Sequence, residues 1–330
     1  MMATLLGAAP PQPTTERAGL PTDEVVLRVT GLTKRYKART AVDGLDLAVR
    51  RGEVFGFLGP NGAGKTTAIA MILGLIAPDA GQITILGHDA LRDREAALRR
   101  VGAIVETPTF YPYLSGIDNL RALALARGGV PAGRFAEVLA LVGLQGRERD
   151  RFGAYSLGMK QRLGIAGALL HEPELLILDE PGNGLDPAGM VEIRELILRL
   201  ARAGQTIILC SHLLAEVQHV CDRVLILAAG RAVAQGEVAE LLNQGAQTVV
   251  RVDDPGRAEM LLRRTPWIER VERDGETLLL TMPQDQAFAL GRLLAEHGLT
   301  IGELRRQERD LERFFLDTTG DVTGDATDKR

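Results

Sequence analysis

Residues 59–67 read GPNGAGKTT and have the residue types and spacing of a phosphate-binding loop. They fit the pattern G-x-x-x-x-G-K-[ST], follow the apolar stretch EVFGFL and open a helical stretch, which is the context that the pattern requires. Glycines let backbone N–H groups turn toward phosphate oxygens, and a helix amino terminus adds partial positive charge. We expect Lys65 to reach the β- and γ-phosphates of a nucleotide and the Thr66 hydroxyl to hold Mg²⁺. The predicted nucleotide-binding residues of this loop are Gly59, Pro60, Asn61, Gly62, Ala63, Gly64, Lys65, Thr66 and Thr67.

Two carboxylates, Asp179 and Glu180, end the fully apolar stretch LLIL. Ionised carboxylates are costly at such a place unless a cation or a water network uses them. We expect Asp179 to lie by Mg²⁺, directly or through water, and Glu180 to polarise the attacking water as general base. A strand that ends in a solvated turn is the alternative, which Pro181 and Gly182 permit. The presence of the lysine-containing loop favours the catalytic interpretation.

His212 follows another apolar stretch, TIILC, and is the one histidine that the sequence marks for chemistry. Ligands of α/β proteins collect at the carboxyl ends of parallel strands, so a histidine that ends the next strand after Asp179 should lie near the same site. An imidazole there can hydrogen-bond a γ-phosphate.

The stretch YSLGMKQR places Ser156 directly before a long helical pattern. Taken alone it predicts an ordinary capped helix, in which the serine hydroxyl accepts a hydrogen bond from an N–H group of the first turn.

These residues need a scaffold, and the chain from residue 24 to about 235 alternates short apolar runs with helical patterns. Such alternation predicts a mostly parallel sheet with covered faces. The expected buried strands are residues 54–58, 103–105, 175–178, 206–210 and 224–227, with antiparallel additions at 25–30 and 83–86. The apolar run 68–77 predicts a buried helix, and the almost wholly helical pattern of 120–170 predicts an inserted helical subdomain.

The pattern changes after residue 245. Strands are expected at 248–252, 268–273, 277–282 and 299–305, and helices at 257–264 and 286–297. Asp274-Gly275 is a hairpin turn signal between the second and third strands. The order β-α-β-β-α-β predicts a small α+β domain of the ferredoxin-like kind. The polar segments 1–23 and 317–330 are predicted to be a disordered leader and tail.

Composition restricts the class of protein. Of the 330 residues 45% are apolar and 25% charged, as in soluble globular proteins. The net charge of −4 argues against a nucleic-acid partner, which usually needs a basic excess. No apolar run reaches the ~18–20 residues that span a bilayer. Cys210 and Cys221 have neither metal-type spacing nor a disulfide framework, which suits buried thiols in a reducing compartment.

Five motifs in one order give the chain a family resemblance. GPNGAGKTT, YSLGMKQR, LLILDEP, NGLD at residues 183–186 and Ser211-His212 resemble the nucleotide-binding subunits of ATP-binding cassette (ABC) transporters over about residues 25–240. The resemblance implies a P-loop NTPase core, an ABC ATPase domain at 24–240 with a helical subdomain at about 107–170, and an accessory domain at 246–316. It implies ATP and Mg²⁺ as cofactors, hydrolysis of ATP, and a second ABC subunit as partner in a homodimer or a heterodimer with a related chain.

The resemblance also implies that some residues of one subunit bind the ATP held by the other subunit. It implies that Ser156 and Gly158 bind the γ-phosphate of ATP held by the phosphate loop of the second subunit, and that Asp186 lies in the loop crossing that interface. Tyr36 matches the aromatic residue that stacks on adenine; an exposed tyrosine without this role is the alternative. Glu180 and His212 are the implied catalytic residues.

The sequence departs from the family pattern at three positions. Leu157 and Met159 stand where the usual motif has a glycine and a glutamine. Glu106 stands where most members have a glutamine that contacts Mg²⁺ and the attacking water. A carboxylate suits Mg²⁺, which prefers hard oxygen ligands, but it also repels the γ-phosphate. Glu106 and the following FYPYLSG look like the bacitracin- and lantibiotic-type exporters, and residues 310–315 are similar to the accessory domain of many drug-exporter cassettes.

The implied function is an ATPase subunit that drives a separate multi-span membrane permease from the cytoplasmic face of the membrane, exporting a drug, an antibiotic or a lipid-like compound. Tyr111, Tyr113 and Leu114 are candidate residues for docking a permease helix, with local packing as the alternative. Two other classes stay open: a non-transport ABC ATPase acting on ribosomes or DNA, and a plain phosphate-loop kinase or GTPase. The sequence leaves open the cargo and the role of residues 245–316.

Overall fold

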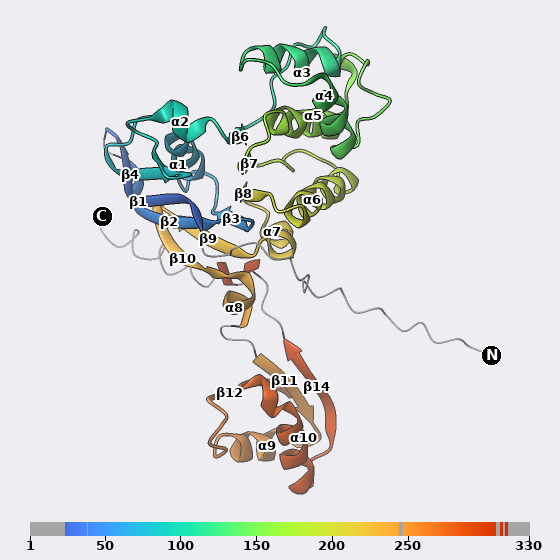
Figure 1. Cartoon of the computed structure of the whole chain (residues 1–330). Helices are drawn as coiled ribbons and strands as arrows, with labels where there is room; N and C mark the ends of the chain where they lie inside the picture. Colours follow the sequence, from blue (N-terminus) through green and yellow to red (C-terminus); the bar gives the residue numbers. More distant parts are fainter. Residues whose placement is uncertain (1–23, 38, 244–246, 308–310, 313, 316–330) are drawn as a thin grey trace, which may run out of the picture. The chain divides into compact units, whose positions relative to one another are not determined.

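The computed structural model describes residues 24–37, 39–243, 247–307, 311–312 and 314–315, so the predicted disordered leader and tail lie outside it. The chain divides into two compact units between Gln235 and Gly236 (Figure 1). In the residues described, the first unit holds two sheets and the second holds one.

The central sheet of the first unit has the strand order β10-β9-β3-β8-β7-β6, and its five strands from β9 to β6 pair in parallel. The strands are β3 (Val54–Leu58), β6 (Val101–Ile104), β7 (Leu175–Asp179), β8 (Thr206–Ser211), β9 (Arg223–Ala228) and β10 (Arg231–Glu237). Every residue of β3, β7 and β8 is buried, as expected of strands covered on both faces. The five predicted parallel strands are confirmed, with ends that move by one or two residues.

An antiparallel sheet with the order β2-β1-β4-β5 completes the first unit. It contains β1 (Val25–Tyr36), β2 (Arg39–Arg50), β4 (Ala80–Ile85) and β5 (His88–Asp89). The predicted antiparallel additions are confirmed, but β2 was missed. Its buried residues Leu45, Leu47 and Val49 alternate with polar or half-buried ones, which is the period-2 signal of a strand with one covered face.

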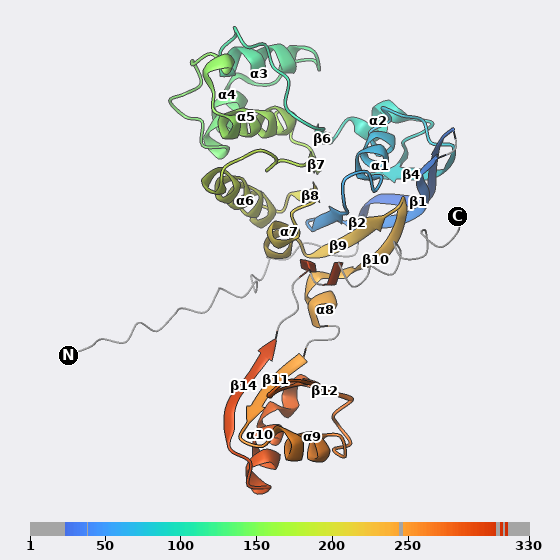
Figure 2. The same cartoon turned by 180° about the vertical axis from the view of Figure 1, so that it is seen from behind.

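Some helices of the first unit gather into a group of their own (Figures 1 and 2). α3 (Gly116–Leu125), α4 (Ala132–Leu141) and α5 (Leu157–Leu169) gather apart from α1 (Lys65–Ile72) and α2 (Arg94–Leu98), so the inserted helical subdomain is confirmed. The described residues of this unit also form α6 (Pro187–Arg202) and α7 (Leu214–Val220). The predicted helix 68–77 was too long, because Gly74 adopts a left-handed φ of 65° and turns the chain after α1.

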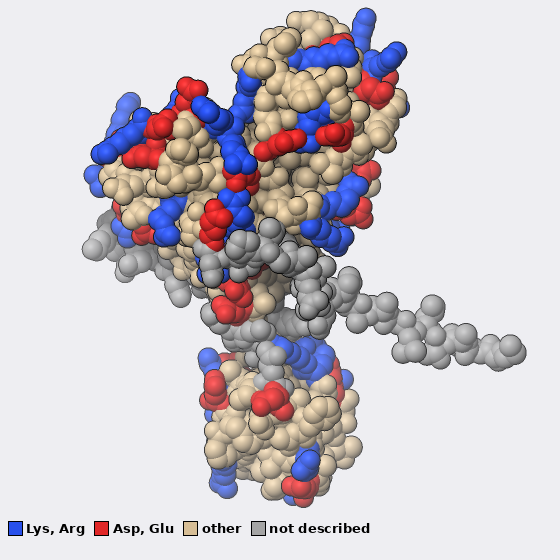
Figure 3. Space-filling model, in the orientation of Figure 1, with Lys and Arg blue, Asp and Glu red and all other residues tan. Residues whose placement is uncertain are grey.

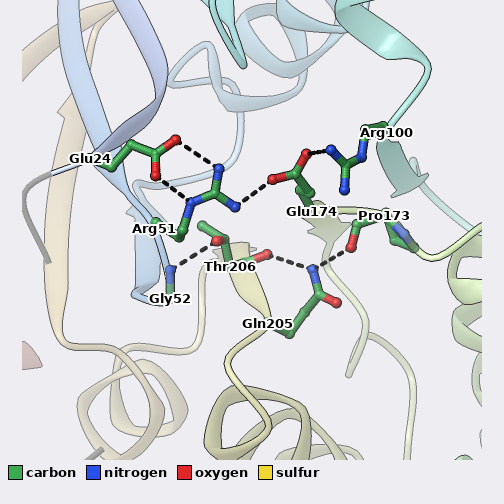
Figure 4. Close-up of polar contacts among 8 residues, drawn as sticks. All are labelled: Glu24, Arg51, Gly52, Arg100, Pro173, Glu174, Gln205 and Thr206. Atoms are coloured by element: carbon green, nitrogen blue, oxygen red, sulfur yellow. Dashed lines mark hydrogen bonds and ion pairs between the residues drawn. The ribbon is translucent and has the colours of Figure 1, made fainter. Parts of the chain in front are cut away.

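A network of charged and polar residues joins the amino-terminal ends of the strands (Figure 4). Arg51, before β3, donates to both oxygens of Glu24 at 2.8 Å and also to Glu174, before β7. Arg100, before β6, pairs with the other oxygen of Glu174. Glu174 therefore lies between two guanidinium groups at the edge of the sheet opposite to the ends of β3 and β7.

From β11 on, the second unit has the predicted order of strands and helices, whereas its first helix, α8 (Val238–Asn243), was missed. After α8 the unit contains β11 (Gln247–Val252), α9 (Pro255–Leu262), β12 (Arg270–Asp274), β13 (Thr277–Thr281), α10 (Ala287–Glu296) and β14 (Ile301–Gln307). Its antiparallel sheet has the order β12-β13-β11-β14, which is the ferredoxin-like arrangement, and its own core includes Val250, Leu280 and Leu290.

The hairpin turn of this unit lies one residue later than predicted. Asp274 pairs with Thr277, so the two turn residues are Gly275 and Glu276 rather than Asp274 and Gly275. Gly275 has a φ of 59°, and a glycine at the first of two turn positions is a recurrent hairpin geometry.

Surface charge is mixed on both units. On the face that Figure 3 shows, Lys and Arg lie close to Asp and Glu over both units. None of the helices in the described part of the chain has the length and apolar character needed to cross a membrane. Cys210 and Cys221 are buried, as the sequence predicts.

Candidate functional site

The phosphate loop lies between the end of β3 and the start of α1, as the motif predicts. Gly64, the residue before α1, has a left-handed φ of 111° and gives the helix no side-chain cap. A Cβ atom there would lie 2.3 Å from the Ala41 carbonyl oxygen, so a side chain does not fit. The first turn of α1 contains no acidic residue. The helix therefore begins with N–H groups and no negative charge beside them, which suits an anion.

A cavity of about 380 Å³ opens at this helix start. Its lining residues are Tyr36, Arg39, Ala41, Pro60, Asn61, Gly62, Gly64, Lys65, Thr66, Thr67 and Glu180. Nine of them were predicted from the sequence. Gly59 and Ala63 belong to the loop but not to this lining, and Arg39 and Ala41 were missed. Arg39 in β2 pairs with Tyr36 in β1, which places both side chains on one face of the hairpin. Because β2 was not predicted, this position of Arg39 could not be predicted either.

Lys65 is held at the bottom of the loop. Its side chain is only 6% exposed, and its Nζ donates to the Gly59 carbonyl oxygen at 2.6 Å. The same ammonium lies 3.6 Å from Glu180 Oε1. These contacts keep a buried cation compensated within reach of the helix start, where phosphate oxygens can replace them.

Asp179, at the end of β7, is a buried acid. Burial above all, and the neighbouring Glu180 charge, raise the pKa of its carboxyl to about 6. The Glu106 charge acts in the same direction, whereas Lys65 and a hydrogen bond with Thr66 oppose the rise. Among the described residues, Asp179 Oδ1 has no hydrogen-bond partner. An uncompensated buried carboxylate oxygen beside a threonine hydroxyl is what a hard cation such as Mg²⁺ would use.

The protein side chains do not make a complete metal site by themselves. Within the described ranges, no group of three or more His, Cys, Asp or Glu side chains is placed to hold a metal ion. A cation here would need the Thr66 hydroxyl and ligands from a bound nucleotide as well, in keeping with Mg²⁺ sites that bind through one or two protein groups plus substrate phosphates. The residues present fit such an ion, with Glu106 and Asp179 as its acidic candidates.

Glu180 is held by two neighbours. Its Oε2 lies 2.7 Å from His212 Nδ1, and its Oε1 faces Lys65. His212 follows β8, which is the sheet neighbour of β7, so the predicted meeting of these residues at one edge is present. Glu180 has a left-handed φ of 50°, a conformation that a non-glycine residue adopts at some energetic cost and that recurs at functional sites.

Ser156 forms the capped helix that the sequence predicts. It is the N-cap of α5, and its hydroxyl accepts a hydrogen bond from Met159 N at 3.2 Å. Asp186 caps α6 in the same way through Gly189 N at 2.9 Å. Ser156, Gly158 and Asp186 are absent from the lining of the cavity, so within one chain the structure does not bring them to the phosphate loop.

The starts of α5 and α6 are nevertheless linked. A Cβ atom on Gly184, in the loop before α6, would lie 3.2 Å from Leu157 Cδ2. One on Gly158 would lie 3.8 Å from Leu185 Cδ2. Leu157, which departs from the family pattern, therefore packs against the loop that carries Asp186.

Tyr36 and the tyrosines after β6 are exposed. Tyr36 is 45% exposed, and Lys34 Nζ lies 5.6 Å from the centroid of its ring. Tyr111 and Tyr113 have ring centroids 5.7 Å apart and are 55% and 67% exposed, whereas Leu114 is half-buried. Asn119 holds this segment by bonding both the N–H and the carbonyl of Tyr111. The two tyrosines therefore form a fixed aromatic pair on the surface.

Comparison with known proteins identifies the family. The sequence model of the ABC transporter family matches residues 42–183. The bacitracin transport ATP-binding protein BcrA of Bacillus licheniformis is 40% identical over 90% of this chain and 98% of its own length. The linearmycin resistance ATP-binding protein LnrL of Bacillus subtilis is 36% identical over 89% and 98%. A solved ATP-binding subunit of an ABC transporter is 34% identical, with a TM-score of 0.60 over 66% of this chain and 92% of that one.

The similarity to BcrA and LnrL covers about nine-tenths of the chain and so reaches into the second unit, whereas the family model lies within the first. The family model and these relatives do not favour the alternatives of a ribosome- or DNA-directed ATPase or of a phosphate-loop kinase or GTPase. The chain belongs to the ABC transporter family and is an ATP-binding, ATP-hydrolysing subunit of it.

Proposed function

We propose that this subunit hydrolyses ATP at the carboxyl ends of β3, β7 and β8 and energises a separate multi-span permease for export. The observation that carries the catalytic part is the Glu180 carboxylate, which lies 2.7 Å from His212 and 3.6 Å from Lys65 at the end of the cavity. This placement suits a general base that takes the proton of an attacking water beside the γ-phosphate.

The other residues divide the remaining tasks. Lys65 and the loop N–H groups bind the phosphates, and the exposed ring of Tyr36 stacks on adenine. His212 orients Glu180 and hydrogen-bonds the γ-phosphate. Mg²⁺ would be held by Thr66, Asp179 and Glu106, and when bound it neutralises charge on the phosphate oxygens.

The site is completed by a second subunit. Ser156 and Gly158 of a second copy, or of a related chain, supply the starting turn of α5 to the γ-phosphate, and Asp186 lies at that interface. The domain assignment belongs to the same proposal: an ATPase domain at 24–240 with a helical subdomain at about 107–170, and an accessory domain at 246–316. The exposed pair Tyr111 and Tyr113 receives a cytoplasmic helix of the permease, which places the subunit at the cytoplasmic face of the membrane.

The proposed cargo is an antibiotic. Two relatives that match about nine-tenths of the chain are named for bacitracin transport and for linearmycin resistance. Glu106 and the FYPYLSG segment, which resemble the bacitracin-type exporters, support the same class. Mixed surface charge offers no broad basic field for nucleic acid on the face that Figure 3 draws, which supports a transport role without a nucleic-acid partner.

The variant Glu180→Gln tests both the proposed hydrolysis of ATP and the proposed export of an antibiotic. We expect purified Glu180→Gln to bind ATP but to turn it over at least ~100-fold more slowly, because the amide cannot accept the proton of the attacking water. In the native host the same variant should lower the inhibitory concentration of bacitracin to that of a deletion strain. Glu216→Gln is the matched control, since Glu216 is also partly exposed and paired, with Arg194, but does not line the cavity.

ATP turnover and bacitracin resistance test different parts of the proposal, so one part can be rejected without the other. Turnover near that of the parent would show that Glu180 is not the base. Lost turnover with unchanged bacitracin resistance would reject this antibiotic as cargo while leaving the ATPase assignment intact.

A further inference from the structure

Arg39 is a cation at the nucleotide cavity to which the preceding roles assign no task. It lies at the start of β2, is exposed, and lines the cavity with Tyr36, its cross-strand partner. Its Nη2 donates to the carbonyl oxygen of Gly62, in the middle of the phosphate loop, at 2.7 Å. The adenine-side hairpin is thus bonded directly to the phosphate-side loop.

The next carbonyl of the loop is held as well. Ala63 O accepts a hydrogen bond at 2.9 Å from the N–H of Gly230, in the turn between β9 and β10. Gly230 O in turn accepts one from Asp43 N at 2.9 Å. The turn fits closely, because a Cβ atom on Gly230 would lie 2.9 Å from Ala41 O. Two successive loop carbonyls are therefore bonded by donors from two separate hairpins.

Holding the carbonyls fixes the N–H groups. Because the peptide group is planar and trans, a carbonyl and the N–H that follows it point in opposite directions. With Gly62 O bonded to Arg39, the N–H of Ala63 points the other way, where it donates to Pro60 O at 3.1 Å inside the loop. With Ala63 O bonded to Gly230, the N–H of Gly64 is directed away from that turn. The N–H groups of a phosphate loop are the groups that bind the ligand.

We propose that Arg39 is a positioning residue of the nucleotide site, which keeps the phosphate loop in its ligand-receiving shape by holding the Gly62 carbonyl. It acts through the loop and not by contact with the γ-phosphate. The inference rests on the proposed role of residues 59–67 as the site for the ATP phosphates. The loop binds every nucleotide that has a β-phosphate. The loss of Arg39 should therefore weaken the binding of ATP and the binding of ADP by the same factor.

The test compares Arg39→Met, which removes the donor, with Arg39→Lys, which keeps one. Binding of ATP and of ADP is measured by calorimetry on the full chain without Mg²⁺, and turnover is measured with Mg²⁺. For Arg39→Met we expect Kd for both nucleotides to rise about 3- to 10-fold, as for the loss of one hydrogen bond. At saturating ATP, kcat should stay within about twofold of the parent, since the catalytic groups are untouched. Arg39→Lys should recover most of the affinity.

Two further variants complete the design. Arg35→Met is the matched control, because Arg35 is exposed on the same hairpin but does not line the cavity. It should bind both nucleotides like the parent. Lys65→Ala should lose nucleotide binding, and normal binding by that variant would overturn the phosphate-loop assignment itself.

The remaining outcomes concern Arg39 alone. Weakened ATP binding with unchanged ADP binding would mean direct contact with the γ-phosphate and would overturn the inference. Parental binding of both nucleotides by Arg39→Met would also overturn it, and so would a lysine variant no better than the methionine variant. In each of these cases, loss of binding in Lys65→Ala would leave the proposed function standing.

Discussion

Asp179 is 2% exposed, and the pKa of its carboxyl is raised to about 6, chiefly by burial. In the unfolded chain an aspartate titrates near ~3.9. The folded protein therefore binds more protons than the unfolded chain between about pH 4 and pH 6, and its free energy of unfolding falls as pH rises through that window. At neutral pH the ionised carboxylate costs about 3 kcal/mol of stability, from ~1.36 kcal/mol for each pKa unit.

Asp179→Asn should therefore stabilise the nucleotide-free protein while it impairs function. We expect a higher melting temperature than the parent at about pH 7.5, and a much smaller difference at about pH 4.5, where the parental carboxyl is mostly protonated in the folded state. Thermal unfolding at the two pH values measures this. Glu95→Gln, at a side chain that is 91% exposed, should change little at either pH. An equal advantage of Asp179→Asn at both pH values would contradict the assigned cause.

Single residues were predictable where the motif is linear. Lys65 stands out because it follows the glycine-rich loop and opens a helix, and Asp179 because it ends an apolar strand, and the chain order alone displays both patterns. Arg39 could not be found in this way, since its place in the cavity depends on the register of β1 with β2. The raised pKa of Asp179 could not be found either, because it depends chiefly on burial, and the opposing charges of Lys65 and Glu106 are brought beside the carboxyl by the fold.

Among the elements, the strands of the parallel sheet were predictable because continuous apolar runs are their direct signature. β10 was missed because its residues are exposed or half-buried, so that hydrophobicity carries no signal there. β2 carried a readable period-2 signal in its second half only. The charge network at the amino-terminal ends of the strands is a product of the topology, since Arg51, Arg100 and Glu174 lie far apart in the chain (Figure 4).

Glu174 is the centre of that network, so a substitution there tests whether the network stabilises the fold. Its side chain is 16% exposed between Arg51 and Arg100, and hydrogen bonds to Glu24 and Glu174 raise the pKa of Arg51 above its ordinary value. Glu174→Gln removes the charge from between two guanidinium groups. We expect a loss of about 1–3 kcal/mol in the free energy of unfolding, measured by urea denaturation at neutral pH.

Binding of ATP separates this effect from damage to the site. The network lies at the amino-terminal ends of the strands and the phosphate loop at the carboxyl ends, so the Kd for ATP should stay within about twofold of the parent. Arg121→Gln is a suitable control, because it breaks an exposed pair with Asp118 and should cost less than ~0.5 kcal/mol. A Glu174→Gln variant as stable as this control would show that the network adds nothing to the fold.

At the scale of the whole molecule, one chain brings only some of the predicted site residues together at the nucleotide cavity. Tyr36, Lys65 and Glu180 meet at one cavity, whereas Ser156 and Asp186 cap helices outside its lining. The sequence supplied the role of Ser156 only by resemblance, because a contact between two chains leaves no periodicity or spacing in either one. The structure of one chain agrees with the capped-helix interpretation and leaves the start of α5 available to a second subunit.

The dimer is tested by keeping the cap of α5 and changing only its charge. Ser, Asp and Asn are about equally good N-caps, so Ser156→Asp and Ser156→Asn should both fold with a parental melting temperature. In a Glu180→Gln background, which holds ATP, sedimentation should show an ATP-dependent dimer for Ser156→Asn. Ser156→Asp should need at least ~10-fold more protein to dimerise, because its carboxylate would face the γ-phosphate across the interface. Equal dimerisation of the two variants would place this helix start away from the nucleotide of the partner subunit.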